Sequence, residues 1–267
     1  MLPDFALHRA TSLADAVSRI SEDDMVLAGG TELLLAMKAG FLAPTELIDV
    51  TRLPELGQVE VVGDELVIGA GASHRQVARN AEVRAHLPML ARVEDHVGNL
   101  RVRAQGTIGG NLCFAEPRSD VTTALLTLDA EVELLGPDGA RRVPVEEFVV
   151  GPYTTVRDES ELCTAVRVPL PGPARAAYEK FQTTERPTVG VAVAERQHGG
   201  GVVVAVGAVS AVPAVWRYDR PEDVDPEAIA AQVDPMEDLA GAADYKRHVT
   251  AVHVRRAVAA VEAGGSR

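Results

Sequence analysis

Two pairs of adjacent glycines most strongly constrain what this chain can fold into. The first pair lies in AGGTEL, residues 28–33, where a buried strand ends and a helix is expected to open at Thr31. The second lies in TIGGN, residues 107–111, inside a polar stretch that we expect to be a long loop. Glycine lets the backbone approach a ligand closely, and the free N–H groups of a new helix attract an anion. Together the two segments predict a cradle for a diphosphate.

The first segment on its own favours a plain strand–helix turn in which Thr31 caps the helix. Neither segment is the fingerprint of the classical NAD-binding fold. GAGASH, which starts at Gly69, has the first two glycines of that fingerprint, but His74 stands where the third would be, and Ser73 with Gln76 predicts a helix cap instead. No Lys-Ser or Lys-Thr pair follows a glycine loop, so a P-loop is disfavoured too.

Composition excludes several classes of function. The chain has 267 residues, and 39 acidic against 26 basic residues give a net charge of −13, which argues against nucleic acid as the main partner. Two cysteines, Cys113 and Cys163, cannot build a zinc or iron–sulfur site unaided. Redox chemistry here would need a bound organic cofactor; we identify no metal site and no catalytic acid or base. The chain shows neither a signal-peptide pattern nor a membrane span, so we expect it to be cytoplasmic.

Strand and helix patterns are mixed without strict alternation, which favours an α+β fold. We expect a β-α-β unit over residues 1–55, a second part over 56–170 that contains two hairpins and several helices, and a third over 174–267 with a sheet followed by helices. PLPGPA, residues 169–174, is the predicted linker between the last two parts.

Several motifs along the chain resemble those of one known protein family. AGGTELLLAMKAG, followed by RAQGTIGGNLCFAEPRSD and later by YEKFQ and DLAGAADYKRHVTAVHVRRAV, resembles the FAD-binding (medium, or M) subunit of the xanthine dehydrogenase and aerobic carbon monoxide dehydrogenase family of molybdenum hydroxylases. The similarity runs through the whole chain in the right order. It implies the two-subdomain FAD-binding fold of the molybdopterin dehydrogenases, related to vanillyl-alcohol oxidase and the bacterial peptidoglycan-precursor reductase, with a C-terminal α+β subdomain beside it.

The resemblance also implies which residues contact FAD. One diphosphate-binding segment would be Val26, Leu27, Ala28, Gly29, Gly30, Thr31, Glu32 and Leu33, and the other Thr107, Ile108, Gly109, Gly110 and Asn111. Val97 would touch the cofactor, Asp120 would bind one of its hydroxyls, Leu162 or Cys163 would lie near the flavin ring, and Lys180 would stand close to the isoalloxazine. Without the resemblance, Asp120 would be a first-turn helix acid and Lys180 a surface residue.

The implied function is electron transfer within a complex. Substrate would be oxidised at a molybdopterin centre on a large partner subunit, and electrons would pass through iron–sulfur clusters on a small partner to this FAD and on to an external acceptor. Phe114, where many relatives carry histidine, and TTERPTVGVAV after Lys180 depart from the family pattern and leave the acceptor open. Two alternatives remain: a self-sufficient FAD oxidoreductase of the related fold, or a structural subunit without cofactor.

Overall fold

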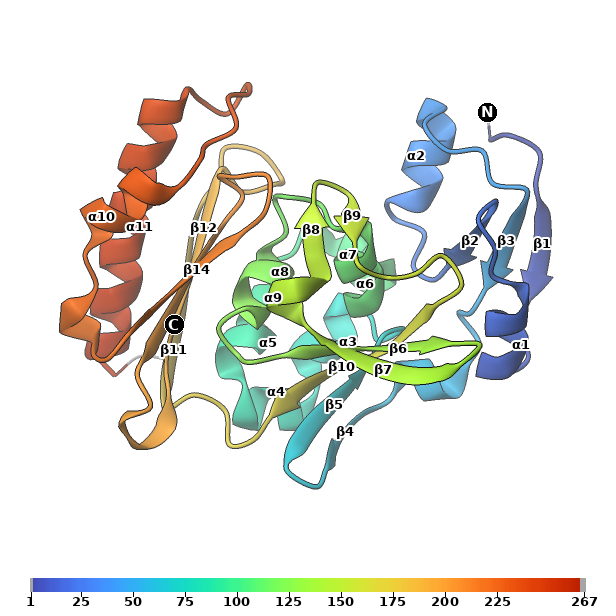
Figure 1. Cartoon of the computed structure of the whole chain (residues 1–267), viewed down its shortest axis with the longest axis horizontal. Coiled ribbons are helices and arrows are strands. Elements are labelled where there is room, and N and C mark those ends of the chain that lie inside the picture. Colours follow the sequence, from blue (N-terminus) through green and yellow to red (C-terminus); the bar gives the residue numbers. More distant parts are fainter. Residues whose placement is uncertain (1, 265–267) are drawn as a thin grey trace.

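The computed structural model describes residues 2–264, and within them three sheets follow one another along the chain, with a two-stranded pair inserted in the sequence of the middle one. In Figure 1 the N-terminal part lies at one end, the largest sheet with its helices in the middle, and the C-terminal sheet with two helices at the other end. Each of the three sheets takes its strands from only one of the three predicted ranges. The boundaries themselves stay a prediction, because Leu56 and Leu162 both pack into the core of the N-terminal part.

The N-terminal part is a parallel sheet of order β1-β3-β2. Its elements are β1 (Ala6–Arg9), α1 (Leu13–Arg19), β2 (Asp24–Leu27), α2 (Leu33–Ala39) and β3 (Glu46–Asp49). Ser12 caps α1 by accepting a hydrogen bond from the Asp15 N–H, and Gly40, with φ of 80°, ends α2. Both boundaries follow from the sequence, because a hydroxyl satisfies a free helix N–H and glycine adopts left-handed backbone freely.

The middle part is an antiparallel sheet of order β4-β5-β10-β6-β7 with helices packed over it. Its strands are β4 (Val59–Val62), β5 (Glu65–Gly69), β6 (Glu131–Gly136), β7 (Gly139–Pro144) and β10 (Leu162–Pro169). The helices are α3 (His74–Arg79), α4 (Ala81–His86), α5 (Pro88–Asp95), α6 (Leu100–Gln105), α7 (Ile108–Phe114), α8 (Asp120–Leu125) and α9 (Val145–Phe148). A 3-10 turn (Pro54–Gly57) precedes the sheet, and β8 (Val149–Gly151) pairs with β9 (Thr154–Thr155).

The prediction of a long loop around TIGGN is wrong. Two short helices, α6 and α7, occupy this stretch, and the paired glycines lie in the first turn of α7. Asn99 caps α6 and Thr107 caps α7, and Gly106 stands between them. The polar and glycine-rich composition hid the helices because each is only six or seven residues long and shows no clear apolar period.

The C-terminal part is an antiparallel meander in the order β11-β12-β13-β14. Its strands are β11 (Arg175–Phe181), β12 (Val189–Glu195), β13 (Val202–Gly207) and β14 (Ala214–Tyr218), and its helices are α10 (Pro226–Gln232) and α11 (Ala243–Glu262), with 3-10 turns at Gln197–Gly199 and Pro221–Asp223. In Figure 1, α11 covers the outer face of this sheet. The other face meets α8, so β12 and β13 are buried on both sides, which explains their unbroken valine and alanine runs.

Within residues 2–264, no helix combines the length and the apolar character needed to cross a bilayer.

Candidate functional site

The first glycine pair lies against the backbone of Gln105 and Gly106, directly before the second glycine segment. A Cβ on Gly29 would lie 2.0 Å from the Gln105 carbonyl oxygen and 2.8 Å from the Gly106 Cα. The backbone at the junction of α6 and α7 therefore fills the space that a side chain would need at position 29. Only glycine fits at position 29, and the approach of β2 to the α6–α7 junction depends on it.

The first segment presents backbone donors. Val26 and Leu27 end β2, and Ala28 packs on the N-terminal core. Glu32 rather than Thr31 precedes α2, and no side chain caps the helix, so the reading of this turn as one capped by Thr31 is wrong. Among the described residues, no acceptor bonds the N–H groups of the four consecutive residues Gly29, Gly30, Thr31 and Glu32.

Four adjacent free N–H groups at a helix start, where the helix dipole is positive, are the chemistry that binds a phosphate oxygen. Gly30 has a φ of 67°, a left-handed conformation that glycine adopts readily, and it turns the chain from β2 into Thr31 and α2. The segment from Gly29 to Leu33 is half-buried, so its donors stand at the surface of the molecule. This donor set fits a diphosphate.

The second segment is built differently, because the chain already bonds the N–H groups of residues 108–111. These bonds are Ile108 N–H to Ala72 O, Gly109 N–H to Ala70 O, Gly110 N–H to the Thr107 hydroxyl oxygen, and Asn111 N–H to Thr107 O. Gly109 is required for packing, since a Cβ there would lie 2.4 Å from the Ala70 Cβ. Asn111 uses its side-chain oxygen to accept a 2.6 Å hydrogen bond from the Ser119 hydroxyl. This segment therefore shapes and supports the cradle, with the Thr107 hydroxyl hydrogen still able to donate.

A buried hydrogen-bonded pair of side chains lies next to Gly106, directly before the second segment. His74 Nδ1 and Glu94 Oε2 are 2.5 Å apart, and both side chains are almost fully buried. The His74 backbone N–H donates to Gly106 O, and the His74 ring lies against the Gly106 Cα. His74 follows the Ser73 cap of α3, and the fold sets it against Gly106, directly before the second segment.

Asp120 and Lys180, predicted separately and sixty positions apart, form an ion pair. Lys180 Nζ lies 2.9 Å from Asp120 Oδ2, and the two side chains are 18% and 5% exposed. Lys180 also donates to the carbonyl of His96, the residue before Val97, at 3.2 Å. Val97 packs against the main core beside this pair. The structure thus brings Val97, Asp120 and Lys180 together, at the contact between the middle part and β11.

Tyr178 joins this group, although sequence analysis did not single it out. Its hydroxyl donates to Asp120 Oδ1 at 2.6 Å. Burial of the hydroxyl, together with the Asp120 charge, raises the pKa of Tyr178 well above its ordinary value. The available signal was its place two residues before Lys180 on a strand, which puts both side chains on one face.

Leu162 and Cys163 open β10 and are buried by protein. The Leu162 side chain belongs to the N-terminal core, whereas Cys163 points to the main core. The neighbouring Cys113 thiol and burial raise the pKa of the Cys163 thiol well above its ordinary value, so it stays a neutral thiol. With exposures of 3% and 7%, these residues offer a ligand little beyond their backbone.

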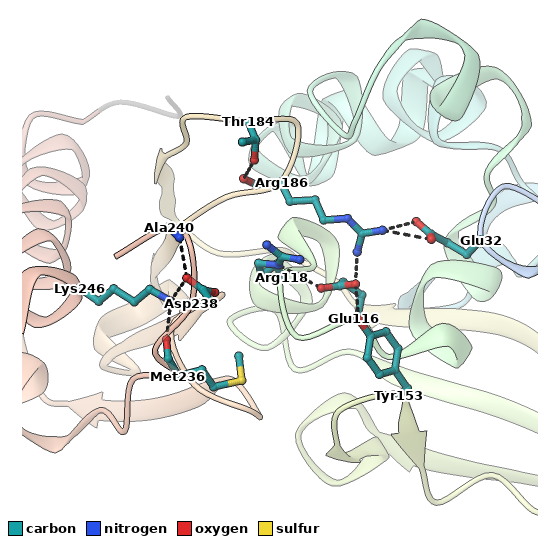
Figure 2. A network of polar contacts seen from close by, with 10 residues as sticks. All are labelled: Glu32, Glu116, Arg118, Tyr153, Thr184, Arg186, Met236, Asp238, Ala240 and Lys246. Carbon is teal, nitrogen blue, oxygen red and sulfur yellow. Dashed lines mark hydrogen bonds and ion pairs between the residues drawn. The ribbon is translucent and has the colours of Figure 1, made fainter. Parts of the chain in front are cut away.

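A network of charges links all three parts of the molecule beside the first glycine segment (Figure 2). Arg186, on the loop between β11 and β12, contacts both carboxylate oxygens of Glu32, at 3.0 and 3.1 Å. It also pairs with Glu116, which accepts a 2.9 Å hydrogen bond from the Tyr153 hydroxyl. Burial opposes ionisation of Glu116, but the charge of Arg186, together with the hydrogen bonds from Tyr153 and Arg118, keeps the pKa of this carboxyl below its ordinary value. Nothing in the sequence pattern pointed to Arg186 or Glu116.

Known proteins are similar to this chain in both sequence and fold. The profile of the family described as "FAD binding domain in molybdopterin dehydrogenase" matches residues 3–171. The carbon monoxide dehydrogenase medium chain of Hydrogenophaga pseudoflava is 33% identical, with 96% of each chain covered. The xanthine dehydrogenase FAD-binding subunit of Escherichia coli O157:H7 is 29% identical over 74% of this chain and 70% of its own length.

A solved structure of carbon monoxide dehydrogenase from Hydrogenophaga pseudoflava superposes with a TM-score of 0.92, at 32% identity, and covers 100% of both chains. Quinoline 2-oxidoreductase from Pseudomonas putida 86, at 23% identity and a TM-score of 0.89, shares the fold. The family resemblance, the α+β FAD-binding fold and the FAD cofactor expected from the sequence are confirmed. The chain belongs to the family of FAD-binding domains of molybdopterin dehydrogenases, as an FAD-binding oxidoreductase subunit.

Proposed function

We propose that this chain holds FAD with its diphosphate against the N–H groups of Gly29, Gly30, Thr31 and Glu32. The observation that carries the proposal is that these four consecutive donors lack an acceptor among the described residues, and that Gly29 lies against Gln105 and Gly106, directly before the second glycine segment. The Thr107 hydroxyl would complete the cradle from the other side. Because the N–H groups at 108–111 are bonded within the chain, the first segment would supply most of the donors.

The rest of the cofactor would extend toward Asp120, Val97 and Lys180. Asp120 would accept a hydrogen bond from a cofactor hydroxyl, and Val97 would offer an apolar contact. Lys180 would stand near the isoalloxazine, but its charge is shared with Asp120 at 2.9 Å. The flavin would then feel an ion pair, and the effect of Lys180 on its reduction potential would be smaller than that of an isolated ammonium group.

In the proposed complex, a large subunit carries molybdopterin and a small subunit carries the iron–sulfur clusters. When bound, FAD takes electrons one at a time and can release two to an external acceptor. The chain's own residues hold and orient the cofactor and set the charges around it. The support is that similar chains are named as a medium chain of carbon monoxide dehydrogenase and an FAD-binding subunit of xanthine dehydrogenase.

Purification from the native source tests this proposal. We expect one FAD per chain, together with a cysteine-rich partner that carries iron and a large partner that carries molybdenum. A preparation without flavin that also ignores added FAD would contradict the cofactor assignment. A chain that binds FAD but oxidises a small substrate without partners would instead favour the self-sufficient oxidoreductase.

A further inference from the structure

Two neighbouring side chains of β11 converge on one carboxylate. Tyr178 and Lys180 are two positions apart on the strand and therefore point to the same face. The Tyr178 hydroxyl donates to Oδ1 of Asp120 at 2.6 Å, and Lys180 Nζ lies 2.9 Å from Oδ2. Each carboxylate oxygen thus has its own donor from the C-terminal part, while Asp120 itself opens α8 in the middle part.

These two donors fix the plane of the carboxylate and leave part of it free. An ionised carboxylate can accept roughly four hydrogen bonds, and the side chains of Tyr178 and Lys180 use two of these positions. With both oxygens held, the side chain of Asp120 cannot rotate, so its remaining lone pairs keep one direction. A carboxylate held in this way binds a hydroxyl group better than one that must be ordered first.

The neighbouring strand is adapted to this hydrogen bond. Gly190 on β12 lies beside Tyr178, and a Cβ there would come within 2.3 Å of the Tyr178 hydroxyl oxygen and 3.9 Å of Asp120 Oδ1. Its backbone is not left-handed, so the conformation of the strand does not require glycine there. The absence of a side chain at position 190 leaves the room that the hydroxyl occupies.

We propose that Tyr178 is a positioning residue of the cofactor site, which orients Asp120 so that its free lone pairs receive a hydroxyl of FAD. This inference rests on the proposed function, because it presumes that FAD binds beside Asp120. Tyr178 acts through Asp120 and is not itself required to touch the cofactor. The site would thereby depend on a residue from the C-terminal part, outside the matched range 3–171.

The test is the affinity for FAD of the full chain prepared without flavin, measured by quenching of flavin fluorescence. We expect Tyr178→Phe to weaken binding by about tenfold, as for loss of one hydrogen bond to a charged group. In an Asp120→Ala background the same substitution should change nothing further, because its target is gone. Gly190→Ala, which keeps the tyrosine but displaces its hydroxyl, should weaken binding in the same direction.

Tyr218→Phe is the matched control, since it removes a tyrosine hydroxyl at the far strand β14 and should leave FAD affinity unchanged. Binding by Tyr178→Phe within about twofold of the parent chain, or an equal loss in the Asp120→Ala background, would overturn the inference. If Tyr178→Phe does not fold, Gly190→Ala decides. A parent chain that binds no FAD at all would show instead that the proposed function is wrong.

Discussion

At position 29 the packing of the backbone requires a residue without a side chain. We expect Gly29→Ala to lower the free energy of unfolding by about 1–3 kcal/mol, because its Cβ must displace backbone. The displaced atoms are the Gln105 carbonyl and the Gly106 Cα. The same shift should separate the two segments and weaken FAD binding by at least roughly tenfold. Urea unfolding and flavin titration measure the two effects.

Gly57→Ala is the control for this substitution. A Cβ on Gly57 would meet nothing within 4 Å, and the backbone there is not left-handed. We expect its stability to change by less than about 0.5 kcal/mol and its FAD affinity to stay unchanged. Equal effects of the two substitutions would mean that the contact at Gly29 has no special role.

A second prediction at this scale concerns pH. The hydrogen bonds from Arg141 hold the pKa of Glu161 below its ordinary value, at distances of 2.5 and 2.8 Å. A lowered pKa in the folded state stabilises the protein above the unfolded pKa, and this contribution disappears as pH falls through the folded one. Glu161→Gln should therefore cost about 1 kcal/mol at pH 7 and progressively less below about pH 4.3.

Unfolding by urea across this pH range checks the sign. Glu159→Gln, two residues away on the exposed turn, is the control and should leave stability unchanged at every pH. A difference between parent and Glu161→Gln that grows as pH falls would contradict the assignment.

Among the elements, the loop from β11 to β12 brings a positive charge to the cradle. Glu32 places a carboxylate within the segment proposed to hold a diphosphate, and Arg186 from this loop pairs with it. We expect Arg186→Gln to weaken FAD binding, because the uncompensated Glu32 repels the diphosphate. The defect should shrink as salt is raised from about 0.01 M to 1 M, since the Debye length falls from about 30 to 3 Å.

Two variants separate this effect from general damage. Glu32→Gln in the Arg186→Gln background should restore much of the affinity, because it removes the repelling charge. Arg217→Gln, which breaks a similar pair with Glu146, should leave affinity unchanged. Lack of rescue by Glu32→Gln would show that Arg186 acts through Glu116 or the shape of the loop instead.

The elements also mark how far sequence reasoning reaches. The strand, glycine turn and helix from Met25 to Gly40 could be predicted because apolar runs and the C-terminal cap at Gly40 are local signals, although the helix begins at Leu33 and not at Thr31. The helices α6 and α7 could not, because short polar helices depend on tertiary packing, here of Gly109 against Ala70. Arg186 and Glu116 were missed for the same reason: an ion pair seventy positions apart leaves no trace in periodicity.

For the molecule as a whole, FAD should contact residues of more than one part and so raise the temperature of unfolding. At about one hundred times the dissociation constant, binding adds about 2.7 kcal/mol to stability, which corresponds to a rise of roughly 5–10 °C for a chain of this size. Thermal scans with and without FAD measure it. Riboflavin, which lacks the diphosphate, should give a much smaller rise at the same concentration; an equal rise would place the binding energy elsewhere than in the glycine segments.

At this scale the family and the identity of the cofactor could be predicted from motifs, whereas the contacts between the site residues in the folded chain could not. Gly29, Asp120 and Lys180 each carry a local or family signal, but only the fold sets Lys180 against Asp120 and Gly29 against Gln105. Tyr178 could be predicted only in part. Strand periodicity puts its side chain on the same face as that of Lys180, but it does not show that the hydroxyl bonds Asp120.

The spread of these residues along the chain has a consequence for biosynthesis. Gly29 is made early, whereas Tyr178, Lys180 and Arg186 come from the C-terminal sheet, whose last strand ends at Tyr218 and whose covering helix ends at Glu262. A nascent chain in which that sheet has not yet folded has only half of the proposed site. Flavin uptake would accordingly wait until the C-terminal sheet has formed, and the folding of that sheet would limit how fast the subunit matures.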